Sequence, residues 1–126
     1  MELIKTNEEL VDVCKSISKE KFITIDTEFI REKTYWSKLC LIQICTHNKE
    51  IIIDPLENNI DLKPFIKILN KKSILKILHS GRQDIEIFYK MSGKIPKPIF
   101  DTQIAAMVCG FGAVSYTHLR AHETVV

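Results

Sequence analysis

Asp26 and Glu28 are the first side chains in this sequence whose types and spacing could do chemistry. They lie in FITIDTEF (22–29), a run of β-branched and aromatic residues that predicts a strand. Alternate residues of a strand share a face, so both carboxylates are expected on the same side. Such a pair is mutually repulsive, and protonation, a nearby Arg or Lys, or a hard divalent cation can relieve the repulsion. A solvated strand edge carries the same pattern, so the pair alone leaves a metal site and an ordinary surface both open.

Asp84 is a third acid that could belong with this pair. It lies in HSGRQDIEIF (79–88), where a buried strand is expected to give way to a helix. At helical spacing Asp84 shares a face with Phe88 and Met91, which places it beside the packed stripe of the helix rather than opposite it. An acid in the first turns of a helix also stabilises the helix dipole, so a purely structural role stays open as well.

The elements that would position these acids alternate between helix and strand. Thr6 with Glu9 and Ser80 with Gln83 form capping-box pairs, and Asp101 is expected to cap a further helix. The short turn between the second and third strands predicts an antiparallel hairpin. Helices are expected over 7–19, from Asp61 onward, through about Met91 and over 102–109, and strands over 22–29, 39–45, 50–54, 74–78 and 99–100. This order predicts an α/β fold, a mixed sheet flanked by helices.

The bulk properties narrow the class of protein. A hydrophobic content of 45% with 27% charged residues is ordinary for a globular domain, and the net charge of +2 is too small to indicate a partner. No apolar run approaches the length of about 20 residues that spans a bilayer, so no membrane association is expected. The opening MELIKTNEEL lacks a secretory apolar core, and the cysteines show no paired spacing, which together predict a cytoplasmic protein. No protein partner can be inferred.

Five segments become specific when they are taken together and in order. They are IDTEF, LCLIQIC, IIIDPL, HSGRQDIEIFY and PIFDTQIAAMVCGFG. In this order they resemble the N-terminal part of the exonuclease domain of the ribonuclease D family, which are DEDD-type 3′–5′ exonucleases. The resemblance covers about residues 3–115. It implies an RNase H-like fold, in which a mixed sheet is flanked by helices.

The resemblance also implies a chemistry. Asp26 and Glu28 match the first acidic motif of the family and Asp84 matches the second, so these three are the expected catalytic and metal-binding residues. They would hold two divalent metal ions, Mg²⁺ or Mn²⁺, for the hydrolytic release of nucleoside 5′-monophosphates from RNA 3′ ends, with tRNA precursors as expected substrates. The alternative is a non-catalytic nucleic-acid-binding fragment with the same fold. Asp101 matches a family position outside the metal site, and a helix N-cap is expected to account for it.

Two smaller groups of residues are candidates with weaker support. Tyr35, Trp36 and Gln43 follow the first motif and could shape a substrate channel, although apolar packing explains the two aromatic residues equally well. His118 and His122 stand four positions apart near the C-terminus, a spacing at which two helical side chains share a face and could bind a metal. Neither group is needed for the chemistry assigned to the three acids.

The C-terminal end departs from the family pattern. The third motif of the family is a tyrosine followed four residues later by the fourth acid, an aspartate. Here Tyr116 is followed at that spacing by Arg120, and no aspartate occurs after Asp101. The sequence therefore predicts an N-terminal portion of the exonuclease domain over 1–115, C-terminally incomplete, and a divergent, non-native tail over 116–126. Such a fragment is expected to be inactive, because one metal ligand and the tyrosine that orients the attacking water are both missing.

Overall fold

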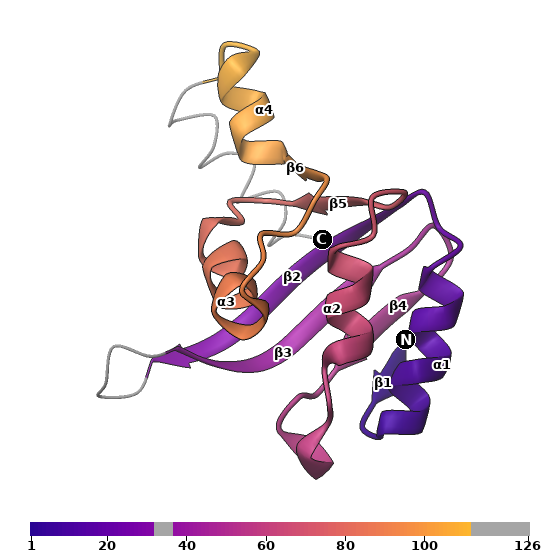
Figure 1. Ribbon diagram of the computed structural model, residues 1–126. Helices are drawn as coiled ribbons and strands as arrows, with labels where there is room; N and C mark the ends of the chain where they lie inside the picture. Colours follow the sequence, from indigo (N-terminus) through magenta and orange to yellow (C-terminus); the bar gives the residue numbers. More distant parts are fainter. Residues whose placement is uncertain (32–36, 112–126) are drawn as a thin grey trace.

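In the part of the chain that the structure describes, a mixed sheet of six strands has helices packed against it (Figure 1). The computed structural model describes residues 1–31 and 37–111. In chain order the elements are β1 (Glu2–Ile4), α1 (Asn7–Ile17), β2 (Phe22–Arg31), β3 (Ser37–Cys45), β4 (Glu50–Ile53), a 3₁₀ turn (Glu57–Asn59), α2 (Lys63–Leu69), β5 (Leu75–Leu78), α3 (Arg82–Ser92), β6 (Ile99–Asp101) and α4 (Thr102–Val108). The expected α/β alternation is confirmed, whereas β1 and the 3₁₀ turn were not anticipated.

The strands lie in the order β1-β4-β3-β2-β5-β6, with β2 near the middle. The β2–β3 and β3–β4 pairs are antiparallel, which confirms the predicted hairpin, and the other three pairs are parallel. The predicted mixed sheet is therefore correct. β1 was not predicted, because three residues at the edge of a sheet are too few to show an alternating pattern.

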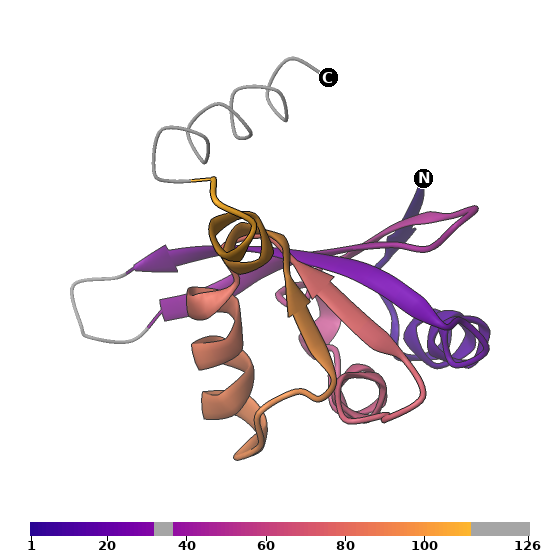
Figure 2. The ribbon, with the colours of Figure 1, turned by 90° about the horizontal axis from the view of Figure 1, so that it is seen from above.

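Three helices cover one side of the sheet, and their apolar faces form the core. Figure 2 shows α1, α2 and α3 on this side and α4 apart from them. Ile23 and Ile25 of β2 are buried in this core. The rings of Phe65 on α2 and Phe88 on α3 meet edge to face, with centroids 5.6 Å apart and an interplanar angle of 67°. This packing holds α3 against its neighbours, whereas α4 buries none of its residues.

The helix N-termini follow the predicted local chemistry at α1 and α4 but not at α2 and α3. The Thr6 hydroxyl oxygen accepts the N–H of Glu9 at 3.2 Å, so the predicted cap of α1 is confirmed, although the helix ends at Ile17 rather than at residue 19. The prediction that Asp61 caps α2 is wrong, because Leu62 occupies the N-cap position. Asp61 precedes the N-cap, and its carboxylate accepts the N–H of Lys63, the first residue of the helix. Within residues 1–31 and 37–111, no helix is long and apolar enough to cross a membrane.

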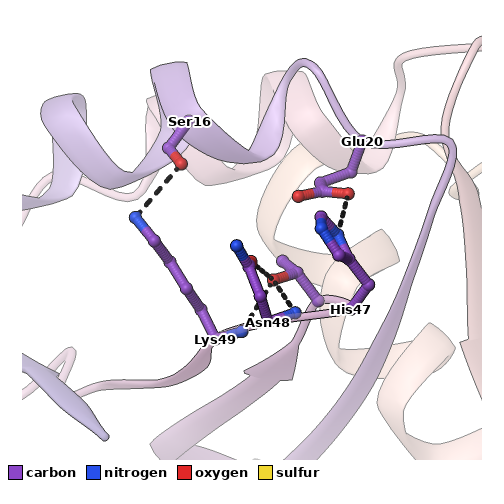
Figure 3. Close-up of polar contacts among 6 residues, drawn as sticks. Ser16, Glu20, His47, Asn48 and Lys49 are labelled. Carbon is purple, nitrogen blue, oxygen red and sulfur yellow. Dashed lines mark hydrogen bonds and ion pairs between the residues drawn. The ribbon is translucent and has the colours of Figure 1, made fainter.

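The turn between β3 and β4 is tied to α1 and its C-terminal extension. His47 Nδ1 lies 3.0 Å from a carboxylate oxygen of Glu20, and Lys49 Nζ donates to the hydroxyl of Ser16 at 3.4 Å (Figure 3). Inside the turn, the Thr46 hydroxyl accepts the N–H of Lys49 at 3.1 Å. These contacts anchor the hairpin that lies next to β2 in the sheet.

A buried lysine ties together the two segments that lead into β5 and β6. Lys76 lies in the middle of β5 with none of its surface exposed. Its Nζ donates to the carbonyl oxygens of Lys71 at 2.6 Å and Lys97 at 2.8 Å. Burial lowers the pKa of Lys76 to about 8. The contacts pin the starts of two parallel strands, and their C-terminal ends therefore meet at the same edge of the sheet.

Candidate active site

The acidic pair lies on β2, a strand with neighbours on both sides. Along β2 the exposed and buried residues alternate, with Thr27 turned toward the helices and Asp26 and Glu28 turned toward the opposite, open face. The same-face placement expected from spacing therefore holds. The pairing of β2 with β3 shifts in register between Glu28 and Phe29, so an irregularity of the ladder lies directly at the acidic pair.

On the side of β2 that faces β5, the strand pairing ends before the residues of the acidic pair. β5 pairs with β2 only from Phe22 to Thr24, and β5 ends at Leu78. Beyond Thr24 that edge of β2 is therefore available to the segment that follows β5. This segment is the turn into α3, and its direction brings the first turn of the helix up to β2.

Asp84 uses this opening to reach β2. It lies in the first turn of α3 and is only 7% exposed. The hydroxyl of Thr27, itself buried, donates a hydrogen bond to Oδ1 of Asp84. The N–H of Thr27 donates to Oδ1 of Asp26 at 3.0 Å. Thr27 is thus bound to both acids, and it connects the helix side of the sheet with the open side.

The charge of Asp84 is poorly compensated in this setting. Burial raises the pKa of Asp84 above its usual value, and the negative charge of Asp26 raises it further. The hydrogen bonds from Thr27 act in the opposite direction without cancelling these effects. A carboxyl with this balance gains from a cation, because a positive charge would offset both the burial and the repulsion.

The turn that leads to Asp84 differs from its prediction. Ser80 does not cap α3: its backbone has a φ of 55°, and Gly81 occupies the N-cap position without a side-chain cap. A Cβ added at Gly81 would lie 2.7 Å from Cβ of Leu78, so the chain there leaves no room for a side chain. The capping-box prediction is wrong because the backbone N–H groups of Ser80 and Gly81 are bound by Asp101 instead, at 3.0 and 2.8 Å.

Sequence reasoning missed two participants in this arrangement, Thr27 and the contacts of Asp101 with the turn. Thr27 stands between the two acids of the first motif, but no local pattern signals that its hydroxyl meets a residue 57 positions away. Asp101 was expected as a helix cap alone. Asp101 ends β6 and the turn follows β5, so its contacts with the turn join two segments that are distant in the sequence. The parallel pairing of β5 with β6 was the only feature that could have indicated that these segments meet.

The remaining candidates have different outcomes. Tyr35 and Trp36 lie outside the described residues, as do His118 and His122. Gln43 is the register partner of Asp26 on β3, and its side chain is exposed. Together with Asp26 and His79 it lines a hollow of about 390 Å³ in the open face of the sheet. Gln43 therefore lies beside Asp26, and its role in a substrate channel stays a prediction.

The three acids suit a hard divalent cation in the type of donor they offer. Asp26, Glu28 and Asp84 supply only carboxylate oxygens, which Mg²⁺ and Mn²⁺ prefer. Within residues 1–31 and 37–111, no three His, Cys, Asp or Glu side chains lie close enough together to hold a metal ion. The described chain thus provides two interacting acids, Asp26 and Asp84, with Glu28 two residues along the same strand face.

Comparison with known proteins agrees with the fold and with the family that the sequence resembles. A sequence profile of a 3′–5′ exonuclease family matches residues 1–125. Ribonuclease D of Bartonella henselae is 47% identical over 120 residues, covering 94% of this chain and 30% of that protein. Ribonuclease D of Zymomonas mobilis is 48% identical over 119 residues, covering 93% and 30%. The chain spans about 30% of the length of these relatives.

Solved structures show the same relationship. The crystal structure of Escherichia coli RNase D, an exoribonuclease, superposes with a TM-score of 0.82 at 39% identity over 88% of this chain and 29% of that one. Trypanosoma brucei RNase D in complex with RNA U12 shares the fold, with a TM-score of 0.70 at 22% identity over 80% of this chain and 37% of that one. Because the family profile matches nearly every residue and ribonucleases D are among the relatives, the chain belongs to the 3′–5′ exonuclease family and resembles ribonuclease D within it.

Proposed function

We propose that this chain carries part of the active site of a metal-dependent 3′–5′ exoribonuclease, with Asp26, Glu28 and Asp84 as its metal-binding and catalytic residues. The observation that supports this most directly is the placement of Asp84. This buried acid reaches across from α3 to Thr27, immediately beside Asp26, and its pKa is raised by burial and by the charge of Asp26. Acids with such uncompensated charge cluster at functional sites.

Each acid has a distinct position relative to a substrate. Asp26 and Glu28 are exposed on the open face of the sheet, where a phosphodiester can approach them. Asp84 approaches from the helix side and is held by the hydroxyl of Thr27. Two divalent ions, Mg²⁺ or Mn²⁺, would neutralise charge on the phosphodiester when bound among these carboxylates. The proposed reaction is hydrolysis that releases nucleoside 5′-monophosphates.

The proposed substrate is the 3′ end of an RNA, with tRNA precursors as the leading class. Its support is the family resemblance: relatives that are 45–48% identical over most of this chain are ribonucleases D. The Escherichia coli protein is described as an exoribonuclease involved in structured RNA processing. Both statements concern longer proteins, of which this chain matches about 30%.

The 126-residue chain by itself is proposed to have little or no activity. Tyr116 is followed four residues later by Arg120 where the family pattern has its fourth acid. Without the fourth anionic ligand metal binding is weakened, and without a tyrosine paired with that acid the attacking water is not oriented. The same observation favours the second candidate function, a nucleic-acid-binding fragment that keeps the fold without the chemistry.

Metal binding is the direct test of the site. We expect Mn²⁺ to bind the 126-residue chain and Asp26→Ala to weaken binding by about tenfold or more, because the loss of a direct ligand costs at least as much affinity as the loss of a residue that orients one. Asp12→Asn is the matched control, since Asp12 is an exposed acid on α1. Its affinity should equal that of the unaltered chain. Equal affinities of the unaltered chain and Asp26→Ala, measured by calorimetry, would rule out the proposed site.

A chimaera separates the enzyme from the binding module. Residues 1–115 joined to the remainder of Bartonella henselae ribonuclease D would supply the downstream part of the domain. We expect this chimaera to shorten a 3′-extended RNA in the presence of Mg²⁺ and to lose this activity with Asp84→Asn. The unextended chain should leave the RNA intact. A folded chimaera without activity would favour the binding module, and robust trimming by the 126-residue chain would refute its proposed inactivity.

A further inference from the structure

The carboxylate of Asp101 lies at the junction of two helices and binds the N-termini of both. Its Oδ1 accepts the N–H groups of Gln103 at 2.9 Å and Ile104 at 3.4 Å, which belong to the first turn of α4. This is the helix cap expected from the sequence. The same Oδ1 accepts the N–H of Ser80 at 3.0 Å, and Oδ2 accepts the N–H of Gly81 at 2.8 Å. These last two contacts belong to the turn into α3, so a helix cap accounts for only half of what Asp101 does.

The sheet brings these two segments together. β5 and β6 run parallel, and Leu78 and Asp101 are register partners at their C-terminal ends. The next residue of each segment adds a second tie, because the Thr102 hydroxyl oxygen lies 2.7 Å from Nδ1 of His79. The Thr102 hydroxyl also lies 3.3 Å from the carbonyl oxygen of Leu78, to which it donates. The turn after β5 is therefore held from the β6–α4 junction.

This turn depends on an external hold. Gly81, the N-cap residue of α3, offers no side chain to cap the helix. Ser80 adopts a left-handed φ of 55°, a conformation that costs a non-glycine residue energy and persists only where its surroundings impose it. Asp84 follows Gly81 by three residues and meets Thr27 on β2. A shift of the turn therefore moves Asp84 relative to Thr27.

We propose that Asp101 is a positioning residue for Asp84: its carboxylate fixes the N-terminus of α3 so that Asp84 reaches Thr27 beside Asp26. Three N–H groups occupy Oδ1 of Asp101 and one occupies Oδ2, so the contacts that Asp101 makes are with the backbone of the two helix starts. Burial alone would raise the pKa of Asp101, but these N–H groups outweigh it and hold the pKa below its usual value. The geometric part of this proposal holds without a metal, and only its consequence for metal affinity rests on the proposed function.

Two substitutions separate the cap of α4 from the hold on α3. Asp101→Ser keeps a good N-cap for α4, since serine is among the preferred cap residues, but its short side chain cannot also reach the turn. Asp101→Asn preserves the shape of the side chain. Three N–H groups converge on Oδ1, so the amide oxygen takes that place and the amide NH₂ faces the N–H of Gly81. Asparagine thus breaks the Gly81 contact selectively.

The first measurement needs no metal. In the metal-free 126-residue chain, amide NMR shifts should move at Ser80, Gly81 and Thr27 in Asp101→Ser, while the Cα shifts of Gln103 and Ile104 keep their helical values. Asp101→Asn should move Gly81 and Thr27 in the same direction and keeps the test available if the serine variant does not fold. Thr6→Ala removes a helix cap far from this junction and is the control. A folded Asp101→Ser with unchanged Thr27, or an equal change in Thr6→Ala, would overturn the proposal.

The second measurement addresses the site. We expect Asp101→Ser to lower Mn²⁺ affinity by about tenfold, as for residues that orient metal ligands, and Thr6→Ala to leave it unchanged. Unaltered Mn²⁺ affinity in Asp101→Ser would overturn the role in the site. If the unaltered chain bound no Mn²⁺ while the Thr27 shift still moved in Asp101→Ser, the proposed function would fail and the positioning of Asp84 by Asp101 would stand.

Discussion

Asp84 and Asp101 form a pair of acids in nearly the same local setting with opposite electrostatics. Each lies at the start of a helix that follows one of two neighbouring parallel strands, β5 and β6. Four backbone N–H groups surround Asp101 and hold its pKa below the usual value. Asp84 is more deeply buried, and its pKa is raised. The difference indicates that backbone N–H groups satisfy one acid, whereas burial and the charge of Asp26 leave the other poorly compensated.

The three acids of the proposed site approach from two faces of the sheet. Asp26 and Glu28 stand on the open face, where water solvates them. Asp84 comes from the helix-covered side and is linked to Asp26 through Thr27. A charge kept uncompensated is a cost to stability that functional sites commonly carry. Changes at Asp101 and Asp84 should therefore have opposite effects on the stability of the metal-free chain.

The largest effect is expected from Asp101→Ala. This change removes the cap of α4 and leaves the N–H groups of Ser80 and Gly81 without their acceptor. We expect the free energy of unfolding to fall by about 2–3 kcal/mol, the sum of a lost cap and of lost charge-assisted hydrogen bonds. Urea unfolding of the two chains measures this. A loss no greater than that of an exposed surface residue would show that Asp101 is not needed for the junction.

Asp84→Asn should act in the opposite direction. Asparagine removes the buried charge and its repulsion with Asp26, while its amide oxygen can still accept the Thr27 hydroxyl. We expect the metal-free chain to gain about 1 kcal/mol at neutral pH, the usual size of gain when a strained functional residue is replaced. Urea unfolding without metal provides the measurement. Destabilisation would mean that the charge of Asp84 is compensated, contrary to the comparison.

The two acids should also respond to pH with opposite signs. The folded pKa of Asp101 is lowered, so its ionised form contributes stability that is present above the unfolded pKa and lost as pH falls through the folded pKa. The folded pKa of Asp84 is raised, so its contribution is present below the unfolded pKa and lost as pH rises through the folded pKa.

Unfolding experiments at a series of pH values test these signs. Relative to wild type, Asp101→Asn should be destabilising near neutral pH and Asp84→Asn stabilising, and both differences should shrink toward acid pH. At every pH, the difference in the free energy of unfolding between a variant and wild type should not exceed its value at neutral pH. Profiles of the same sign for the two variants would break the comparison between the acids.

The smallest effect concerns the hydroxyl that Asp84 binds. Thr27→Val keeps the shape of the side chain and removes the donor to Asp84. Because a hydrogen bond to a charged acceptor is stronger than one to a neutral amide, Thr27→Val should cost about 0.5–1 kcal/mol more in the unaltered chain than in Asp84→Asn. A double-mutant cycle measures this coupling. A coupling free energy of zero would show that the hydrogen bond between Thr27 and Asp84 does not contribute to stability.

Local patterns were sufficient for much of the fold. The alternation along β2, the Thr6 cap, the Asp101 cap and the end of α3 within one residue of Met91 all follow from periods and side-chain chemistry within a few residues. The failures were also local in origin. Ser80 and Gln83 have the pattern of a capping box, yet a carboxylate from 21 residues away binds the backbone of Ser80 instead.

The sequence by itself determined the class of fold, the shared face of Asp26 and Glu28, and the motif resemblance that brought Asp84 into consideration. The tertiary structure decided that Asp84 meets Thr27 beside Asp26, and that Asp101 holds the turn before it. The physical reason is the range of the interactions. Hydrophobic periodicity and helix caps depend on residues that are close in the sequence. The contact between Asp84 and Thr27 instead needs the parallel strands β2, β5 and β6 to lie side by side.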